Sequence, residues 1–233
     1  MKDAEAVGYF TAATKILVIT MSLSSSLGAV IMPRTSNLIA ENKMDEFKVL
    51  IQKSYDFILA LATPLTVGLI FTSPSVILLL SGESFAPAIL TSQIVALNIL
   101  MVGISGVMGL QVLYPMGRIG AVVNVVLNVL LIPVYGHNGT AVAYMLAEVA
   151  VTVSMFIIGR RYIPIQFFKK EHLHYVLGSV VMGGCLCLIS LLHLNSIATL
   201  LLMIIVGVFV YAIILLCLRN FIGMTLCGLI KRN

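Results

Sequence analysis

Seven long apolar stretches follow one another along this chain of 233 residues. They cover residues 6–32, 55–73, 88–116, 119–134, 140–159, 175–194 and 197–218. A helix needs about 20 apolar residues to cross the hydrocarbon core of a bilayer, and these stretches are close to that length. Their apolar residues run continuously, whereas the strands of a spanning β-barrel alternate apolar and polar residues. The sequence therefore predicts an all-α fold: a polytopic membrane helical bundle of about seven transmembrane helices.

The composition excludes a soluble globular domain. Hydrophobic residues make up 60% of the chain and charged residues 10%, against about 25% charged residues in a typical soluble domain. The net charge of +5 could suggest nucleic acid as a partner. The basic residues, however, lie in short loops between apolar stretches and not on one soluble face. We therefore expect the lipid bilayer as the partner of this surface, and no nucleic acid.

The basic residues also predict the orientation of the chain. If the N-terminus lies outside, twelve of the 14 Lys and Arg residues fall on one side of the membrane, as the positive-inside rule requires. These twelve are Arg34, Lys43, Lys48, Lys53, Arg118, Arg160, Arg161, Lys169, Lys170, Arg219, Lys231 and Arg232. We expect a multi-pass protein of the bacterial plasma membrane with an outside N-terminus and a cytoplasmic C-terminus.

Three parts are predicted along the chain. Residues 1–159 form a core of five spans, residues 160–174 a basic cytoplasmic loop, and residues 175–233 a two-helix hairpin with a tail. Within the core, residues 34–54 carry apolar side chains on one helical face and charged side chains elsewhere. This pattern is typical of a helix at the membrane surface, so an interfacial helix is expected there.

Two ionisable residues, Lys15 and Glu148, fall deep inside the apolar stretches. A charge within the hydrocarbon costs a few kcal/mol, so each of them requires a partner or a wet cavity. The predicted topology places both residues at similar depth, which makes an ion pair between them a reasonable hypothesis. Such a pair either fixes helix packing or lines a cavity that binds substrate, and the sequence leaves both open.

Polar side chains at helical spacing surround these two residues. Asn124 and Asn128 lie on the fourth span, and Tyr144 precedes Glu148 by one turn on the fifth. The stripe on the first span consists of Thr11, Lys15, Ser22 and Ser25. Because a polar stripe in contact with lipid is penalised, we expect these faces to point into the bundle, as a dry seam or as a water-filled passage.

An enzyme is not expected. Residues 103–106 read GISG, which looks like the G-x-S-G motif of rhomboid intramembrane proteases and would make Ser105 a nucleophile. Such a serine needs a histidine on a neighbouring helix, but His137, His172 and His174 fall in loops and His193 lies at a span end. The four cysteines have no paired spacing, so we expect no metal and no cofactor.

Five motifs follow one another in an order that is informative. Residues 7–16 read VGYFTAATKI, Pro33-Arg34 end the first span, residues 82–88 read GESFAPA, residues 124–139 read NVVLNVLLIPVYGHNG, and Ala147-Glu148 follow. They resemble, in this order, the motifs V-G-Y-Y-S-A-A-Y-K-I, L-P-R, G-x-x-F-x-x-A, N-x-x-L-N-x-x-L-I-P-x-Y-G-x-x-G and A-E. These are motifs of bacterial polysaccharide flippases, the lipid-linked oligosaccharide or O-antigen type, in the multidrug/oligosaccharidyl-lipid/polysaccharide exporter superfamily.

The resemblance implies a transporter of two lobes around a central cavity. Such proteins move undecaprenyl-diphosphate-linked oligosaccharide repeat units across the plasma membrane by alternating access, for cell-surface polysaccharide biosynthesis. By this resemblance the chain is the C-terminal portion, a fragment that starts in the second lobe. It would then be inactive without a first lobe, which a separate chain would encode. Lys15 is expected to meet the substrate diphosphate or to pair with Glu148, while Asn124, Asn128 and Tyr144 are lesser cavity candidates.

Two alternatives stay open. A drug or ion antiporter of the same superfamily would need an intramembrane carboxylate as a proton relay, and Glu148 is the candidate. A non-transporting membrane scaffold, or a remnant without activity, is the other alternative.

Overall fold

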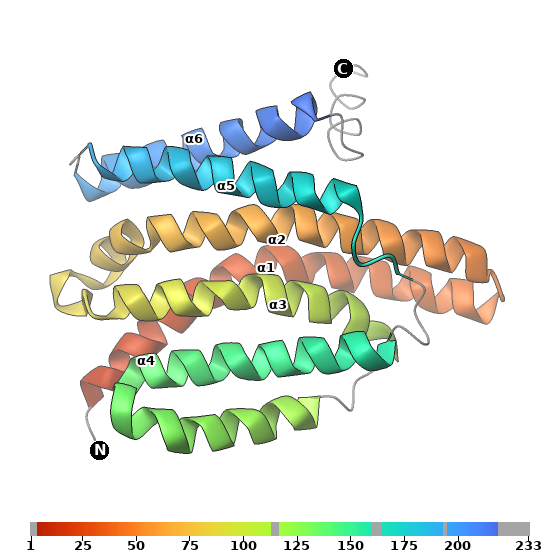
Figure 1. Cartoon of the computed structure of the whole chain (residues 1–233), viewed down its shortest axis with the longest axis horizontal. Coiled ribbons are helices and arrows are strands. Elements are labelled where there is room, and N and C mark those ends of the chain that lie inside the picture. Colours follow the sequence, from red (N-terminus) through yellow and green to blue (C-terminus); the bar gives the residue numbers. More distant parts are fainter. Residues whose placement is uncertain (1–3, 113–116, 160–164, 193–194, 219–233) are drawn as a thin grey trace.

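The computed structural model describes residues 4–112, 117–159, 165–192 and 195–218. The chain forms α1 (Ala4–Ala40), α2 (Met44–Ser81), the short 3₁₀ helix η1 (Glu83–Phe85), α3 (Ala88–Val112), α4 (Gly117–Gly159), α5 (Lys170–Ser190) and α6 (Ser196–Cys217). Six of these helices are long and apolar enough to cross a membrane. The predicted class, an all-helical polytopic membrane bundle, is confirmed (Figure 1).

Helix α4 is a hairpin and not a straight rod. Its backbone leaves helical geometry at Gly136, where φ is 55° and ψ is −130°, and Figure 1 shows the chain folding back there. The arms, residues 117–135 and 137–159, pack directly on each other, because a Cβ at Gly120 would lie 2.5 Å from Cγ2 of Val151. Six apolar helices, one of them folded double, therefore match the seven stretches expected from the sequence.

Residues 34–54 differ from the prediction of a separate interfacial helix. Residues 34–40 are the last turns of α1, and residues 44–54 are the first turns of α2. The turn between the two helices contains Asn42, which has a φ of 55°. Most of the apolar face of this region is buried: Leu38, Phe47 and Ile51 join a core cluster with Tyr175 of α5, whereas Met44 at the start of α2 is exposed. The amphipathic pattern thus reflects packing of the ends of α1 and α2 against α5 and not a separate helix.

Helix α2 lies at the centre of the molecule and contacts α1, α3, α5 and α6. Figure 1 shows the α5–α6 hairpin along one side of it and α3 along the other, with α4 beyond α3. The largest core cluster lies between α1, α2 and α3 and contains Leu17, Ile58, Ala62, Val95 and Ile99.

Two prolines inside α2 leave backbone carbonyls without their usual helical partners. Pro64 cannot donate to the carbonyl oxygen of Ala60, and the hydroxyl of Tyr211 from α6 donates to that oxygen at 2.7 Å. Pro74 cannot donate to the carbonyl oxygen of Ile70, which accepts from Nε2 of Gln93 on α3 at 3.2 Å. Neighbouring helices therefore satisfy the polar groups that the prolines free, which is how membrane helices tolerate proline.

Candidate functional site

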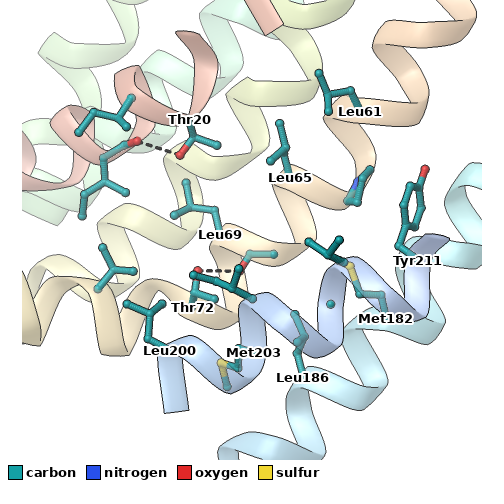
Figure 2. Close-up of a pocket in the computed structure, with 18 of the residues that line it drawn as sticks. Thr20, Leu61, Leu65, Leu69, Thr72, Met182, Leu186, Leu200, Met203 and Tyr211 are labelled. Carbon is teal, nitrogen blue, oxygen red and sulfur yellow. Dashed lines mark hydrogen bonds between the residues drawn. The ribbon is translucent and has the colours of Figure 1, made fainter. Parts of the chain in front are cut away.

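An apolar groove with a volume of about 840 Å³ runs between α1, α2, α5 and α6 (Figure 2). Its walls include Ile16 and Ile19 of α1, Leu65 of α2, Met182 of α5 and Met203 of α6. Along α2 it extends from Phe57 to Leu80, a rise of about 35 Å at 1.5 Å per residue. The groove is therefore as long as the hydrocarbon core of a bilayer is thick, about 30 Å.

The polar side chains that line the groove are hydrogen-bonded to backbone carbonyl oxygens. Four residues of its lining carry a hydroxyl, and each hydroxyl donates to a carbonyl oxygen. The pairs are Thr20 to Ile16 at 3.0 Å, Ser22 to Ile19 at 2.7 Å, Thr72 to Gly68 at 2.8 Å, and Tyr211 to Ala60 at 2.7 Å. Charged side chains are absent from the lining that the described residues provide. The groove thus suits a long hydrocarbon chain and offers little to a polar ligand.

The polar stripe predicted on the first span exists, but its described side chains are not packed inside the bundle. Thr11, Lys15 and Ser22 lie on one exposed face of α1, and the side chain of Ser25 lies outside the described part. The buried face of α1 carries Ala13, Ile16 and Leu17 instead. Because Ser22 also lines the groove, the stripe that contains Lys15 reaches the edge of the groove.

The hypothesis of an ion pair between Lys15 and Glu148 is wrong for this structure. Glu148 is half-buried on the second arm of α4, and Lys15 is exposed on α1. Among the ion pairs of the described residues, none joins these two side chains. The contact between the two helices involves Tyr144, which packs against the cluster that contains Ala13. The apolar face of α1 therefore meets α4, and the lysine is left on a different face.

The remaining candidates lie on the α4 hairpin. Asn128 donates from Nδ2 to the carbonyl oxygen of Asn124 at 2.9 Å and to its Oδ1 at 2.8 Å. The side-chain Oδ1 of Asn128 is buried without a hydrogen-bond partner among the described residues. Tyr144 and Glu148, one helical turn apart on the second arm, are both half-buried. The structure therefore joins the two asparagines but does not bring Lys15 to the carboxylate.

The rhomboid-like serine is hydrogen-bonded within its own helix. Ser105 is buried, and its hydroxyl donates to the carbonyl oxygen of Val102 at 3.3 Å. No group of three His, Cys, Asp or Glu side chains that could hold a metal ion occurs in the part of the chain that the structure describes.

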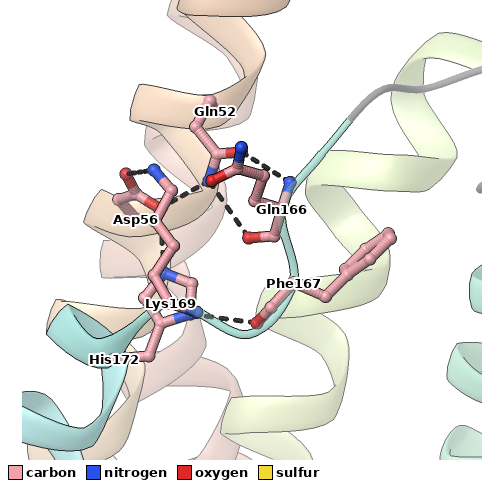
Figure 3. A network of polar contacts seen from close by, with 6 residues as sticks. All are labelled: Gln52, Asp56, Gln166, Phe167, Lys169 and His172. Atoms are coloured by element: carbon pink, nitrogen blue, oxygen red, sulfur yellow. Dashed lines mark hydrogen bonds and ion pairs between the residues drawn. The ribbon is translucent and has the colours of Figure 1, made fainter.

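Sequence reasoning missed a polar network around Asp56 of α2 (Figure 3). The side chain of Asp56 is 10% exposed. It accepts from Lys169 Nζ at 2.9 Å on Oδ2, and from His172 Nε2 at 2.9 Å and Gln52 Nε2 at 2.7 Å on Oδ1. One signal was available, namely an acidic residue next to an apolar stretch, but Lys169 and His172 lie more than 110 residues further along the chain.

Long apolar helices around an apolar groove define a polytopic membrane protein. A family model described as lipid II flippase MurJ matches residues 6–208. The chain therefore belongs to the MurJ family, whose members are flippases of lipid-linked precursors. No curated protein matches the chain. This family is part of the multidrug/oligosaccharidyl-lipid/polysaccharide exporter superfamily, which the motifs of the sequence resemble. The chain is therefore a multi-pass membrane protein of a family of lipid-linked precursor flippases.

Proposed function

We propose that this chain binds a polyprenyl-diphosphate-linked sugar precursor and takes part in moving it across the bacterial plasma membrane. The observation that carries the proposal is the apolar groove beside the exposed stripe of Lys15. The polyprenyl tail would lie in the groove, where apolar contacts stabilise it. The diphosphate would meet the Lys15 ammonium at the groove edge, because a buried anion requires a cation or hydrogen-bond donors.

The identity of the sugar on the polyprenyl diphosphate is a separate question. The family description favours lipid II, whereas the motifs of the sequence resemble those of flippases for oligosaccharide repeat units. Both cargoes share the polyprenyl diphosphate, which is the part that the groove and Lys15 would bind. Asn124, Asn128, Tyr144 and Glu148 remain candidates for contacts with the sugar, because they offer donors and acceptors on α4.

The exposed stripe on α1 supports a second proposal about assembly. In alternating access two lobes rock about one site between them, and this chain supplies a polar face without a cover for its described side chains. We expect a first lobe to cover the face of Thr11, Lys15 and Ser22. The chain alone would then bind the precursor without transporting it.

The test is photo-crosslinking with a polyprenyl diphosphate that carries a diazirine in its tail. The purified chain is used in nanodiscs, and adducts are mapped by mass spectrometry. Adducts are expected on groove residues such as Leu65 and Met203, and not on residues such as Val129 and Val180, which are exposed outside the groove.

Two glycines provide a matched pair of variants for this test. A Cβ at Gly68 or at Gly184 would meet no atom within 4 Å, but Gly68 lines the groove and Gly184 does not. Gly68→Leu should reduce the groove adducts, because the new side chain fills the space, and Gly184→Leu should leave them unchanged. Adducts spread evenly over lipid-facing residues, or equal effects of both variants, would contradict binding in the groove.

Lys15→Gln tests the diphosphate contact. Hydrogen bonds to charged groups contribute about 1.5–3 kcal/mol, so affinity should fall roughly 10- to 100-fold. The control is Lys48→Gln, which removes an exposed lysine paired with Asp45 at the start of α2. If Glu148→Gln abolishes proton-driven drug export while precursor binding is absent, the antiporter is the better description. If the chain neither binds the precursor nor exports drugs, the non-transporting membrane scaffold is the better description.

A further inference from the structure

We propose that His172, Asp56 and Lys169 form a proton-dependent clasp that holds residues 165–169 and the start of α5 against α2, and so positions one wall of the apolar groove. The three side chains lie on α2, on the segment before α5, and on the first turn of α5 (Figure 3). Asp56 is the common acceptor, at 2.9 Å from both Lys169 Nζ and His172 Nε2.

The segment before α5 is fixed by more than the ion pairs. Oε1 of Gln52 on α2 accepts from the backbone N–H of Gln166 at 2.7 Å. Phe167 packs edge-on against Tyr55 of α2, with ring centroids 5.7 Å apart. Ile165 is buried in the cluster that also contains Tyr55. Side chains of α2 therefore hold residues 165–167 over their whole length, and the Asp56 cluster closes this contact at its end.

The ring of His172 carries the proton dependence. Its Nε2 faces the Asp56 carboxylate at 2.9 Å, and its Nδ1 faces the carbonyl oxygen of Phe167 at 2.9 Å. Both of these oxygens are acceptors, so only the doubly protonated imidazolium donates to both. A neutral ring that keeps its proton on Nε2 would point the Nδ1 lone pair at the carbonyl of Phe167. It would instead accept from the backbone N–H of Lys169, which lies 3.3 Å from Nδ1.

Deprotonation of Nδ1 therefore replaces its hydrogen bond to the carbonyl oxygen of Phe167, at 2.9 Å, by a longer and weaker one from the N–H of Lys169, at 3.3 Å. Charged and titratable groups surround the ring of His172. The groups that face its ring are Asp56 and Tyr55 of α2, Lys169 of the segment and Tyr175 of α5. Other charged or titratable groups of the adjoining turns are Lys53, Lys170, Glu171 and His174. The side chain of His172 is 11% exposed, so its ring nitrogens have little access to water.

The clasp can affect the groove because α5 forms part of the groove wall. Helix α5 packs tightly on α2 at Gly183, where a Cβ would lie 3.0 Å from Cγ1 of Val67. Met182 and Leu186, on either side of this contact, line the groove. A helix attached to α2 at both His172 and Gly183 keeps its angle to α2. A neutral His172 keeps the Nε2 bond to Asp56 but loses the charge of the imidazolium, and a neutral hydrogen bond is about half as strong as a charge-assisted one. The weaker attachment would let the groove wall move. This consequence for transport rests on the proposed function, but the clasp itself does not.

The experiment uses the full chain in nanodiscs without substrate, so its result is independent of whether the precursor is bound. Histidines are labelled with ¹⁵N, and the signals of His172 are assigned by their loss in His172→Gln. A spin label is placed at Phe168→Cys, since Phe168 is 92% exposed, after the four native cysteines are replaced. Ring protonation and label mobility are followed between about pH 5 and 8, the range in which histidine titrates.

We expect both ring nitrogens of His172 to carry protons at the acidic end, and Nδ1 to lose its proton as the pH rises. Label mobility should increase over the same pH range, and His172→Gln should make it independent of pH. The matched control is His174→Gln, which should keep the wild-type response. A wild-type label that does not respond to pH, or a response that survives in His172→Gln, would overturn the proposal. So would a change in ring protonation without a change in label mobility.

Discussion

The two prolines of α2 illustrate how single residues are accommodated in this fold. Each proline leaves one carbonyl oxygen free, and each oxygen is reached by a side chain of another helix. The sequence indicates that Pro64 lies inside a span and is tolerated there. It does not indicate the partner, because Tyr211 lies 151 residues after the carbonyl it contacts. Non-local contacts of this kind are set by tertiary packing and leave no periodic signal in the sequence.

Tyr211→Phe should destabilise the chain by about 1 kcal/mol, because it leaves a buried carbonyl oxygen without a donor. In a Pro64→Ala background the loss should be smaller, since residue 64 then has an N–H that can donate to Ala60. The measurement is a double-mutant cycle on the free energy of unfolding in detergent micelles. Equal losses in the two backgrounds would mean that the hydroxyl acts elsewhere.

At the scale of elements, the sequence predicts the apolar stretches well and their ends less well. Apolar stretches of sufficient length are a strong signal, and all seven match helical segments. The error lies at residues 34–54, where an amphipathic pattern has two explanations. Its apolar face can lie on a membrane surface or against other helices, and the pattern is the same in both cases. The burial of Phe47 and Ile51 identifies the second.

The α4 hairpin gives a prediction at this scale. A Cβ at Gly139 would lie 2.5 Å from the carbonyl oxygen of Leu131, which is backbone and cannot rotate away. Gly139→Ala should therefore destabilise the protein by about 1–3 kcal/mol, the usual cost of overpacking. The control is Gly106→Ala, whose Cβ would meet nothing within 4 Å. This variant should be neutral or stabilising by up to about 1 kcal/mol, because alanine favours a helix. Thermal unfolding of both variants checks the difference.

Gly136→Ala tests the turn of the hairpin by a different mechanism. Open space surrounds the Cβ position, but a φ of 55° with a ψ of −130° is a backbone conformation that side-chain-bearing residues rarely adopt. The expected loss is about 1–3 kcal/mol from backbone strain alone. If Gly136→Ala unfolds at the wild-type temperature while Gly139→Ala does not, the hairpin depends on close packing and not on its turn geometry.

For the whole molecule, the sequence predicted polar stripes on α1 and α4 but not how these helices are arranged around a site. The stripes on α1 and α4 follow from helical spacing, and the described side chains confirm that each stripe shares a face. The ion pair was inferred from equal depth, but depth does not fix the rotation of a helix about its axis. The groove could not be predicted, because it is formed by four helices whose apolar residues also resemble lipid-facing ones.

The face of Lys15 allows a test of the complete transporter. If this face borders a water-filled passage, Lys15→Cys should react readily with a water-soluble maleimide in a chain without native cysteines. Val129→Cys is the control, because Val129 is an exposed apolar residue of α4 that lipid would cover. Similar reaction rates at both positions would place the Lys15 face in lipid. Protection of Lys15→Cys on co-expression of a first lobe would identify that lobe as its cover.

Helix α2 has 38 residues and therefore rises about 57 Å, well beyond the hydrocarbon core of about 30 Å. Its first turns carry Asp45, Glu46, Lys48 and Lys53, so we expect this end to project out of the hydrocarbon and Asp56 to lie near the level of the lipid headgroups. At that level the local pH is set by the potential of the membrane surface and differs from the pH of the bulk solution. A surface potential of about −30 mV raises the local proton concentration roughly threefold. A clasp at this depth would therefore close at a higher bulk pH in membranes rich in anionic lipid, and lipid composition would become a control on the position of α5.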